Sequence, residues 1–216
     1  MIVGHFGVSF AIKSVRKDVP LWVLFVAVQI LDFLWLTFVS TNIEQAGINR
    51  QLPSVPIEFY HMPYSHSLLG ALMWSGVTFV VYKLIPLGRH TMAARMVALA
   101  VLSHWIVDIF VHRPDLALYD DAYKIGLSGW NFPLLGYLLE GACLFAGIAL
   151  YLRVTTPRTI VGRYAAVAYG IALMGVQAVV VFGLINPPNM AIVLAGVFIF
   201  YVIAGALAYA VERTRT

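Results

Sequence analysis

Three ionisable residues, His104, Asp108 and His112, follow one another at intervals of four within an otherwise apolar run. Residues four apart lie on the same face of an α-helix, so His104 and Asp108 could bind one cation as a pair. His112 lies about 12 Å along the helix axis from His104, which is too far for these two to share one ion. Asp108 could bridge toward His112, which would leave room for a second metal. Because ionisable groups at membrane depth are costly and usually functional, this run predicts an intramembrane metal site.

The composition indicates an integral membrane protein of one domain. Of the 216 residues, 61% are hydrophobic and only 11% are charged, whereas a soluble domain carries roughly a quarter charged residues. Basic loops on one membrane face account for the net charge of +4, so we expect no nucleic-acid partner. Cys143 is the single cysteine, which excludes an intrachain disulfide, and we interpret it as a small core residue.

Six apolar stretches predict an all-α fold, a polytopic bundle of about six transmembrane helices. They cover approximately residues 20–41, 66–87, 91–112, 133–152, 164–185 and 190–211. Residues 2–12 are apolar but too few to cross a bilayer, so a short re-entrant or interfacial helix is expected there. The single membrane domain would span 1–216, with the metal site in about 1–115 and charge-free helices at about 164–211.

The distribution of basic residues predicts the orientation. One membrane face would collect Lys13, Arg16, Lys17, Lys83, Arg89, Arg95, Arg153, Arg158, Arg163, Arg213 and Arg215. The other face would carry only Arg50, Arg113 and Lys124. Because cytoplasmic loops are rich in lysine and arginine, we expect the first face to be cytoplasmic. The histidines and carboxylates inside the spans then lie in the outer half of the bilayer.

Several segments contribute candidate metal ligands at this depth. The candidate ligands are His5, Asp32, His66, His104, Asp108 and His112. Imidazole and carboxylate ligands without thiolate suit Zn²⁺, with Mn²⁺ or Fe²⁺ as alternatives. His66 would also lie in the first turn of a helix capped by Ser65, where free backbone amides favour a phosphate oxygen of a substrate.

Four residues are candidates for catalysis or for substrate binding. Asp108 and Glu140 could act in catalysis, but Glu140 could instead form a plain interhelical hydrogen bond. His61 could contact substrate or simply face water in its loop. Arg113 could bind a substrate phosphate or snorkel at a helix end.

Four motifs carry a family resemblance. They are Gly4-His5, Leu31-Asp32, His61-Met-Pro-Tyr-Ser-His66-Ser-Leu and Leu102-Ser-His104-x-x-x-Asp108. In order and spacing they resemble the membrane-bound metal-dependent hydrolases of the YdjM/YbcI type, over about the first half of the chain. The resemblance implies a multi-pass hydrolase of the bacterial inner membrane. After Asp32 this chain lacks the second aspartate and the histidine of the family pattern, which His112 and Asp115 could replace.

The sequence therefore predicts a membrane-embedded metal-dependent hydrolase whose site faces the non-cytoplasmic side. A catalytic metal keeps an open coordination position and lowers the pKa of bound water to about 7. Such water could attack an ester or phosphoester of a lipid or lipid-linked substrate in the outer leaflet. One alternative is a transporter that passes divalent cations or protons along the same His/Asp cluster. Another is a lipid-binding or assembly subunit with a structural metal. Membrane lipids are the expected partners, and the sequence does not indicate an oligomeric state.

Overall fold

A computed structural model describes residues 1–86, 90–184 and 186–216 of the chain. The helices are α1 (His5–Val15), α2 (Leu21–Val28), α3 (Ile30–Ser40), α4 (Leu68–Leu84), α5 (Thr91–Asp108), α6 (Pro133–Val154), α7 (Ile160–Val181) and α8 (Met190–Arg213). Two antiparallel strands, β1 (Gln45–Ile48) and β2 (Ile57–His61), form a hairpin, and a short 3-10 helix covers Gly129–Asn131. The predicted all-α bundle is confirmed.

The count of six transmembrane spans is too high. Four helices, α5 to α8, are long and apolar enough to cross a membrane, and the pair α2 and α3 makes a fifth span if its 46° bend is allowed. The break falls at Gln29, whose side chain donates to the Ile2 carbonyl. Helix α4 starts only at Leu68 because Ser67 caps it, and its 17 residues extend about 25 Å, less than the roughly 30 Å hydrocarbon core. The predicted span ends at 87 and 185, and the basic residue Arg89, lie outside the described residues.

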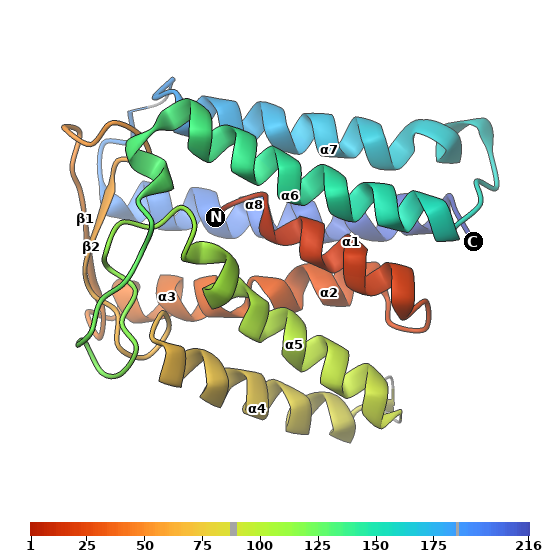
Figure 1. Ribbon diagram of the computed structural model, residues 1–216, viewed down its shortest axis with the longest axis horizontal. Coiled ribbons are helices and arrows are strands. Elements are labelled where there is room, and N and C mark those ends of the chain that lie inside the picture. Colours follow the sequence, from red (N-terminus) through yellow and green to blue (C-terminus); the bar gives the residue numbers. More distant parts are fainter. Residues whose placement is uncertain (87–89, 185) are drawn as a thin grey trace.

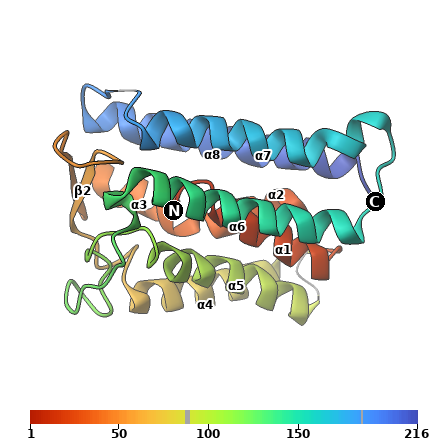
Figure 2. The same ribbon diagram turned by 45° about the horizontal axis from the view of Figure 1, so that its top comes forward.

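The helices run along the long axis of the molecule in three layers (Figures 1 and 2). Helices α7 and α8 form one outer layer, α4 and α5 the other, and α1, α2, α3 and α6 lie between them. The closest approach joins α1 to α6: a Cβ on Gly7 would lie 2.1 Å from the Cys143 carbonyl oxygen, and one on Gly147 would lie 1.9 Å from the Gly7 carbonyl oxygen. Small residues are needed here for the two backbones to pack.

Residues 2–12 belong to a helix enclosed by the bundle. His5, Phe6 and Phe10 of α1 are buried. Helix α1 begins near the middle of the molecule and runs to the end where the chain terminates (Figure 1). Helix α1 is therefore enclosed by other helices and does not lie on the outside of the bundle. It brings His5 into the interior of the protein.

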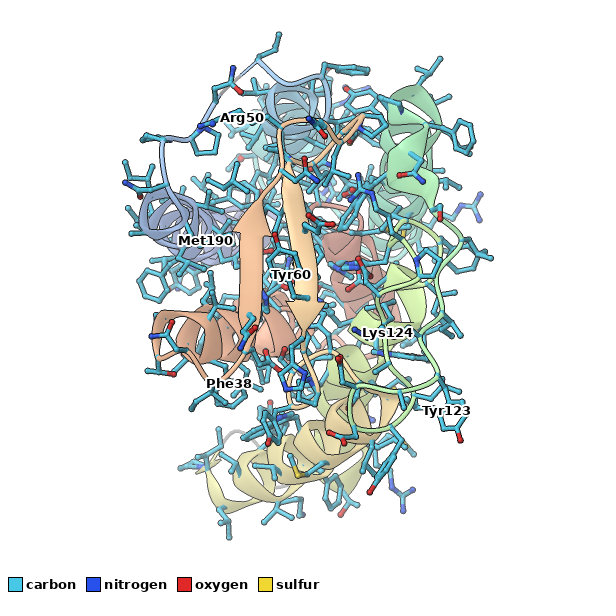
Figure 3. The ribbon with its side chains drawn as sticks, turned by 90° about the vertical axis from the view of Figure 1, so that its left-hand side faces the viewer. Phe38, Arg50, Tyr60, Tyr123, Lys124 and Met190 are labelled. Carbon is cyan, nitrogen blue, oxygen red and sulfur yellow. The ribbon has the colours of Figure 1, made fainter. Side chains whose placement is uncertain are left out.

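The two ends of the bundle differ in character. At one end the β1–β2 hairpin lies across the helix ends, with the loop that carries Lys124 beside it (Figure 3), and Lys124 Nζ donates to the Tyr60 carbonyl at 3.0 Å. The hairpin lies in residues 42–65, between the first two apolar stretches of the sequence. The C-terminal ends of α1, α4, α6 and α8 lie at the opposite end (Figure 1). This end carries most of the basic residues, as the charge pattern predicts.

Candidate metal centre

Asp108, the last residue of α5, lies at the centre of four histidines. Its carboxylate oxygens are 3.1 Å from His5 Nε2, 3.2 Å from His104 Nε2, 3.5 Å from His112 Nε2 and 3.9 Å from His66 Nε2. All five side chains are buried. Residues from α1, α5, and the loops before α4 and after α5 thus converge on one carboxylate.

A second carboxylate, that of Asp32 at the start of α3, joins the same cluster. Asp32 Oδ1 lies 3.3 Å from His66 Nε2 and 3.6 Å from His104 Nε2. Its other oxygen accepts a hydrogen bond from the Tyr201 hydroxyl of α8. Asp32 is therefore oriented by α8 toward the two histidines.

Two overlapping groups of three side chains have the geometry of a metal site. One is His5, His104 and Asp108, and the other is Asp32, His66 and His104. Within each group the potential ligand atoms lie within 4.8 Å of one another. Five of the six predicted ligands therefore come together in these groups, with His104 shared between them. His112, the sixth, borders them through Asp108.

Hydrogen bonds to the Nδ1 atoms leave the Nε2 atoms of three histidines free to act as ligands. His104 Nδ1 lies 2.7 Å from the Val28 carbonyl oxygen, which can only accept. His66 Nδ1 lies 2.8 Å from Ser65 Oγ, whose proton is donated to Glu44. In neutral histidine a protonated Nδ1 leaves a lone pair on Nε2. This arrangement is the usual one for histidines that bind metals.

His112 has the same arrangement with a carboxylate as its partner. Its Nδ1 lies 2.8 Å from Asp115 Oδ1, and its ring packs against the Trp130 ring with centroids 4.3 Å apart. Burial lowers the pKa of His112 to about 4, against the opposing effect of Asp115. The imidazole is thus neutral at pH 7, with its Nε2 lone pair directed toward Asp108.

Several buried polar atoms of the cluster have no hydrogen-bond partner among the described residues: both ring nitrogens of His5, Nε2 of His104 and Oδ2 of Asp108. The His5 and His104 rings are stacked, with centroids 3.8 Å apart, and the Met1 amino nitrogen contacts Asp108 Oδ1. Buried polar atoms are rarely left unpaired. The Met1 amino group forms an ion pair with Oδ1 of Asp108 alone, so Oδ2 of Asp108 and Oδ1 of Asp32 still face histidine Nε2 atoms, with no further cationic group of the described residues paired with them. The residues present therefore fit a bound divalent cation.

A small apolar cavity of about 60 Å³ adjoins the cluster. Asp32, His66, Asp108 and His112 contribute its polar wall, and the remaining lining is mostly apolar: Met1, Ile2, Trp35, Val55, Ile57, Phe59, Trp130, Val197 and Tyr201. Val55, Ile57 and Phe59 come from the hairpin region. The hairpin thus covers the cluster at this end of the bundle.

Glu140 of α6 has a structural position beside the cluster. Its Oε2 accepts hydrogen bonds from the backbone amides of Ile2, Val3 and Gly4 at 2.8, 2.8 and 3.2 Å, and its Oε1 accepts one from Gln177 at 2.7 Å. Both oxygens are engaged, and Glu140 belongs to neither metal-binding group. The hydrogen-bonding alternative raised by the sequence therefore describes it better than the catalytic one. It anchors the N-terminal end of α1.

The predicted substrate contacts His61 and Arg113 lie outside the cluster. His61 Nδ1 is 3.2 Å from Asp121 Oδ2 in the neighbouring loop. Arg113 donates to Asn131 Oδ1 and to the Ser54 carbonyl, both at 2.9 Å. These contacts connect loops at the hairpin end of the bundle. Neither His61 nor Arg113 belongs to a metal-binding group.

The predicted anion site in the first turn of the helix after Ser65 is wrong. His66 precedes α4, and Ser67 rather than Ser65 caps it. The first-turn amides are occupied: Leu68 and Leu69 donate to the carbonyls of the 117–118 segment, and Gly70 donates to Ser67 Oγ. No donor of this turn is left for a phosphate.

Glu44, between α3 and β1, is a positioning residue that the sequence did not reveal. It is buried and accepts hydrogen bonds from the amides of Tyr64 and Ser65 at 2.9 and 2.8 Å and from Ser65 Oγ at 2.5 Å. Ser65 in turn holds His66. A carboxylate in a polar connection carries no spacing signal toward a histidine more than twenty residues on.

Glu44→Gln is expected to weaken metal binding without removing it. The glutamine cannot accept all three hydrogen bonds, so Ser65 no longer fixes His66, and losses of about ten- to a hundredfold in affinity are typical of such partners. Competition with a chromogenic chelator measures the affinity. The matched control is Glu58→Gln, which changes a half-buried carboxylate of β2 that accepts a hydrogen bond from Asn49. Equal affinities of the two variants would contradict the role of Glu44.

Comparisons of the chain with protein-family models, with curated proteins and with solved structures find no match. The resemblance of the motifs to metal-dependent hydrolases remains a prediction.

Proposed function

We propose that this membrane protein is a metal-dependent hydrolase of the bacterial inner membrane, with its site toward the non-cytoplasmic side. One observation carries the proposal: the Nε2 atoms of buried histidines face two buried carboxylates, and several of these atoms have no hydrogen-bond partner among the described residues. The separation of basic helix ends from the cluster supports the orientation.

Asp32, His66, His104, Asp108 and His5 would hold the metal. Imidazole and carboxylate donors favour Zn²⁺, with Mn²⁺ or Fe²⁺ as alternatives. When bound, the metal supplies Lewis acidity toward an ester oxygen and toward water. The shared position of His104 in both groups allows either one ion or two neighbouring ions.

His112 is placed to accept a proton, and Asp115 favours its protonated form against the effect of burial on the pKa. Asp115 fixes the His112 ring through Nδ1, and the neutral Nε2 faces the cavity beside Asp108. As water attacks the carbonyl carbon or phosphorus of an ester, His112 Nε2 accepts its proton and returns it to the leaving alkoxide. The apolar cavity wall favours a lipid or lipid-linked substrate.

The transporter alternative has less support. Between His5 at the start of α1 and the basic end of the bundle, the interior is aromatic: Phe6 stacks on Phe25 with centroids 4.3 Å apart, and Phe10 packs against Phe25 and Tyr151 at 5.5 and 5.3 Å. Among the described residues of this core, no chain of ionisable groups continues from the cluster. A proton or cation pathway needs such a chain.

Metal content is the decisive test of the proposal. The protein is purified in detergent, exposed to Zn²⁺ and passed through gel filtration. Plasma mass spectrometry then measures its metal content, and chromogenic acyl esters and phosphodiesters measure its hydrolytic activity. We expect stoichiometric metal and metal-dependent hydrolysis. Wild-type protein that never retains stoichiometric metal would falsify the proposal. Uptake of Zn²⁺ into proteoliposomes that contain the protein, without any hydrolysis, would favour the transporter.

His112→Gln is expected to separate catalysis from metal binding. Both metal-binding groups remain intact, so metal content should stay near that of the wild type. Hydrolysis should fall by about a hundredfold or more, the range that a general base contributes. Loss of metal in parallel with activity would instead identify His112 as a ligand, and His61→Gln serves as a control that changes neither quantity.

A further inference from the structure

A cavity of about 440 Å³ opens at the basic end of the bundle, far from the hairpin. Five cationic side chains line it, together with one carboxylate: Lys13, Lys17, Arg158, Arg213, Arg215 and Glu212. The five cationic side chains outnumber the Glu212 carboxylate, and they would still do so if Thr216 carried a terminal carboxylate. The cavity therefore suits an anionic group.

The cations of this cavity are not equally available. Lys13 forms an ion pair with Glu212 and donates to the carbonyls of Lys17 and Val19. Arg215 donates to Thr155 and to the Gly162 carbonyl. The guanidinium of Arg158, by contrast, is exposed and has no hydrogen bond or ion pair with the described residues.

Arg213 stands where the cavity meets an apolar groove. It lies over the Tyr209 ring, 5.8 Å from the centroid. The groove, also about 440 Å³, runs between α2, α3 and α8 and is lined by Trp22, Val26, Phe33, Tyr201, Val202, Gly205, Ala206 and Tyr209. Trp22 and Tyr209 line both hollows, so the basic cavity and the groove are continuous.

We propose that an anionic phospholipid binds along this surface. Its phosphate lies in the basic cavity against Arg158 and Arg213, and one acyl chain lies in the groove along α8. Membrane-spanning helices place the groove among acyl chains, aromatic residues such as Trp22 and Tyr209 are typical of the membrane interface, and basic pockets between helices bind anionic headgroups. A single amphiphile satisfies both hollows.

The far end of the groove reaches the metal centre. From Tyr209 to Tyr201 the groove follows about 12 Å of α8, at 1.5 Å per residue. Tyr201 also lines the small cavity beside the cluster, and its hydroxyl donates to Asp32. The tail of the bound lipid therefore packs against the residue that orients a metal ligand. The site itself does not depend on the proposed hydrolase activity.

Native mass spectrometry of the detergent-solubilised full chain tests the proposal, with phosphatidylglycerol and phosphatidylcholine as probes. Wild-type protein should retain one phosphatidylglycerol in preference to phosphatidylcholine. Arg158→Gln combined with Arg213→Gln should reduce this preference by about tenfold or more, because two charges near the headgroup are lost. Arg163→Gln, at the same end and over Tyr164, is the matched control and should keep it.

Filling the groove tests the acyl-chain half of the site. Gly205→Leu should abolish retention of either lipid, since a Cβ there meets only Val26 Cγ2 at 3.9 Å and a longer side chain enters the groove. Gly196→Leu on the same helix, with nothing within 4 Å of its Cβ, should leave retention unchanged. Ala206→Phe, at an exposed position, repeats the test if Gly205→Leu fails to fold.

Three outcomes would overturn the proposal. The first is equal retention of both lipids by every variant. The second is undiminished retention in Gly205→Leu and Ala206→Phe. The third is a dimer that carries no lipid, which would indicate that a second copy of the chain covers the groove. Metal content measured on the same samples should be unchanged by the groove variants, so a failure of lipid binding is distinguishable from a failure of the metal centre.

Discussion

Asp108→Asn is expected to leave the protein unable to retain metal through gel filtration. The Asp108 carboxylate is the only group that contacts all four histidines of the cluster among the described residues. An amide removes the negative charge that offsets a divalent cation and turns one ligand oxygen into a donor facing imidazole lone pairs. The loss of affinity should exceed the roughly hundredfold limit typical of residues that only orient ligands. Plasma mass spectrometry of the purified variant gives the metal content.

His104→Ala should give the same result, because His104 belongs to both metal-binding groups. His90→Ala is the matched control: this histidine precedes the opposite end of the same helix and is exposed. Both alanine variants should elute as folded monodisperse protein. Full metal content in Asp108→Asn or His104→Ala would show that the cation, if any, binds elsewhere.

The i, i+4 spacing and the cost of burying charge were sufficient to predict the core of this site. His104 and Asp108 share one helix face, and Asp32 and His66 are polar residues at the depth of a membrane span, so their types and positions alone indicated convergence. The structure brings these four together. Which neighbours orient them depends on long-range packing, and that part was not predictable.

The break between α2 and α3 shows why. A straight span over residues 20–41 would leave no free carbonyl at Val28. Because α2 ends there, its last carbonyls lose their helical partners, and the Val28 oxygen accepts from His104 Nδ1 instead. The only local sign of a break is Gln29, and a polar residue within a span does not by itself predict one. The count of six spans is too high because of this break and because α4 begins only at Leu68, after its Ser67 cap.

Glu140 and Glu44 are both buried carboxylates that position other groups, and the sequence reveals only the first. Glu140 lies inside an apolar helix, so the sequence marked it as important but could not distinguish catalysis from anchoring. Glu44 lies in a polar connection, where nothing in the sequence distinguishes it, although it orients Ser65 and thereby His66. Burial within a membrane span identifies unusual carboxylates, while their roles follow from the hydrogen bonds they accept.

Glu140→Ala is expected to destabilise the protein by about 3 kcal/mol, because two buried amides and one partly buried amide next to the start of α1 lose their acceptor and each unsatisfied buried donor costs about 1–3 kcal/mol. The amides of Ile2, Val3 and Gly4 have their side-chain acceptor in Glu140. Denaturant unfolding in detergent, followed by tryptophan fluorescence, measures the change. Glu58→Ala, at a half-buried position where, of the described residues, only the side chains of Asn49 and Tyr60 donate to the carboxylate, should lower the free energy of unfolding by less.

The same residue allows anchoring to be separated from proton transfer. Glu140→Gln keeps one oxygen for the α1 amides, but its new amide group faces Gln177 Nε2, so we expect intermediate stability and metal content near that of the wild type. If Glu140 acted as a general base, the glutamine variant would lose hydrolysis while keeping wild-type stability, and the alanine variant would unfold no more readily than the control. If Glu140 is an anchor, both variants should lose stability, the alanine variant more than the glutamine variant. Hydrolysis should then fall only to the extent that His5 moves away from Asp108.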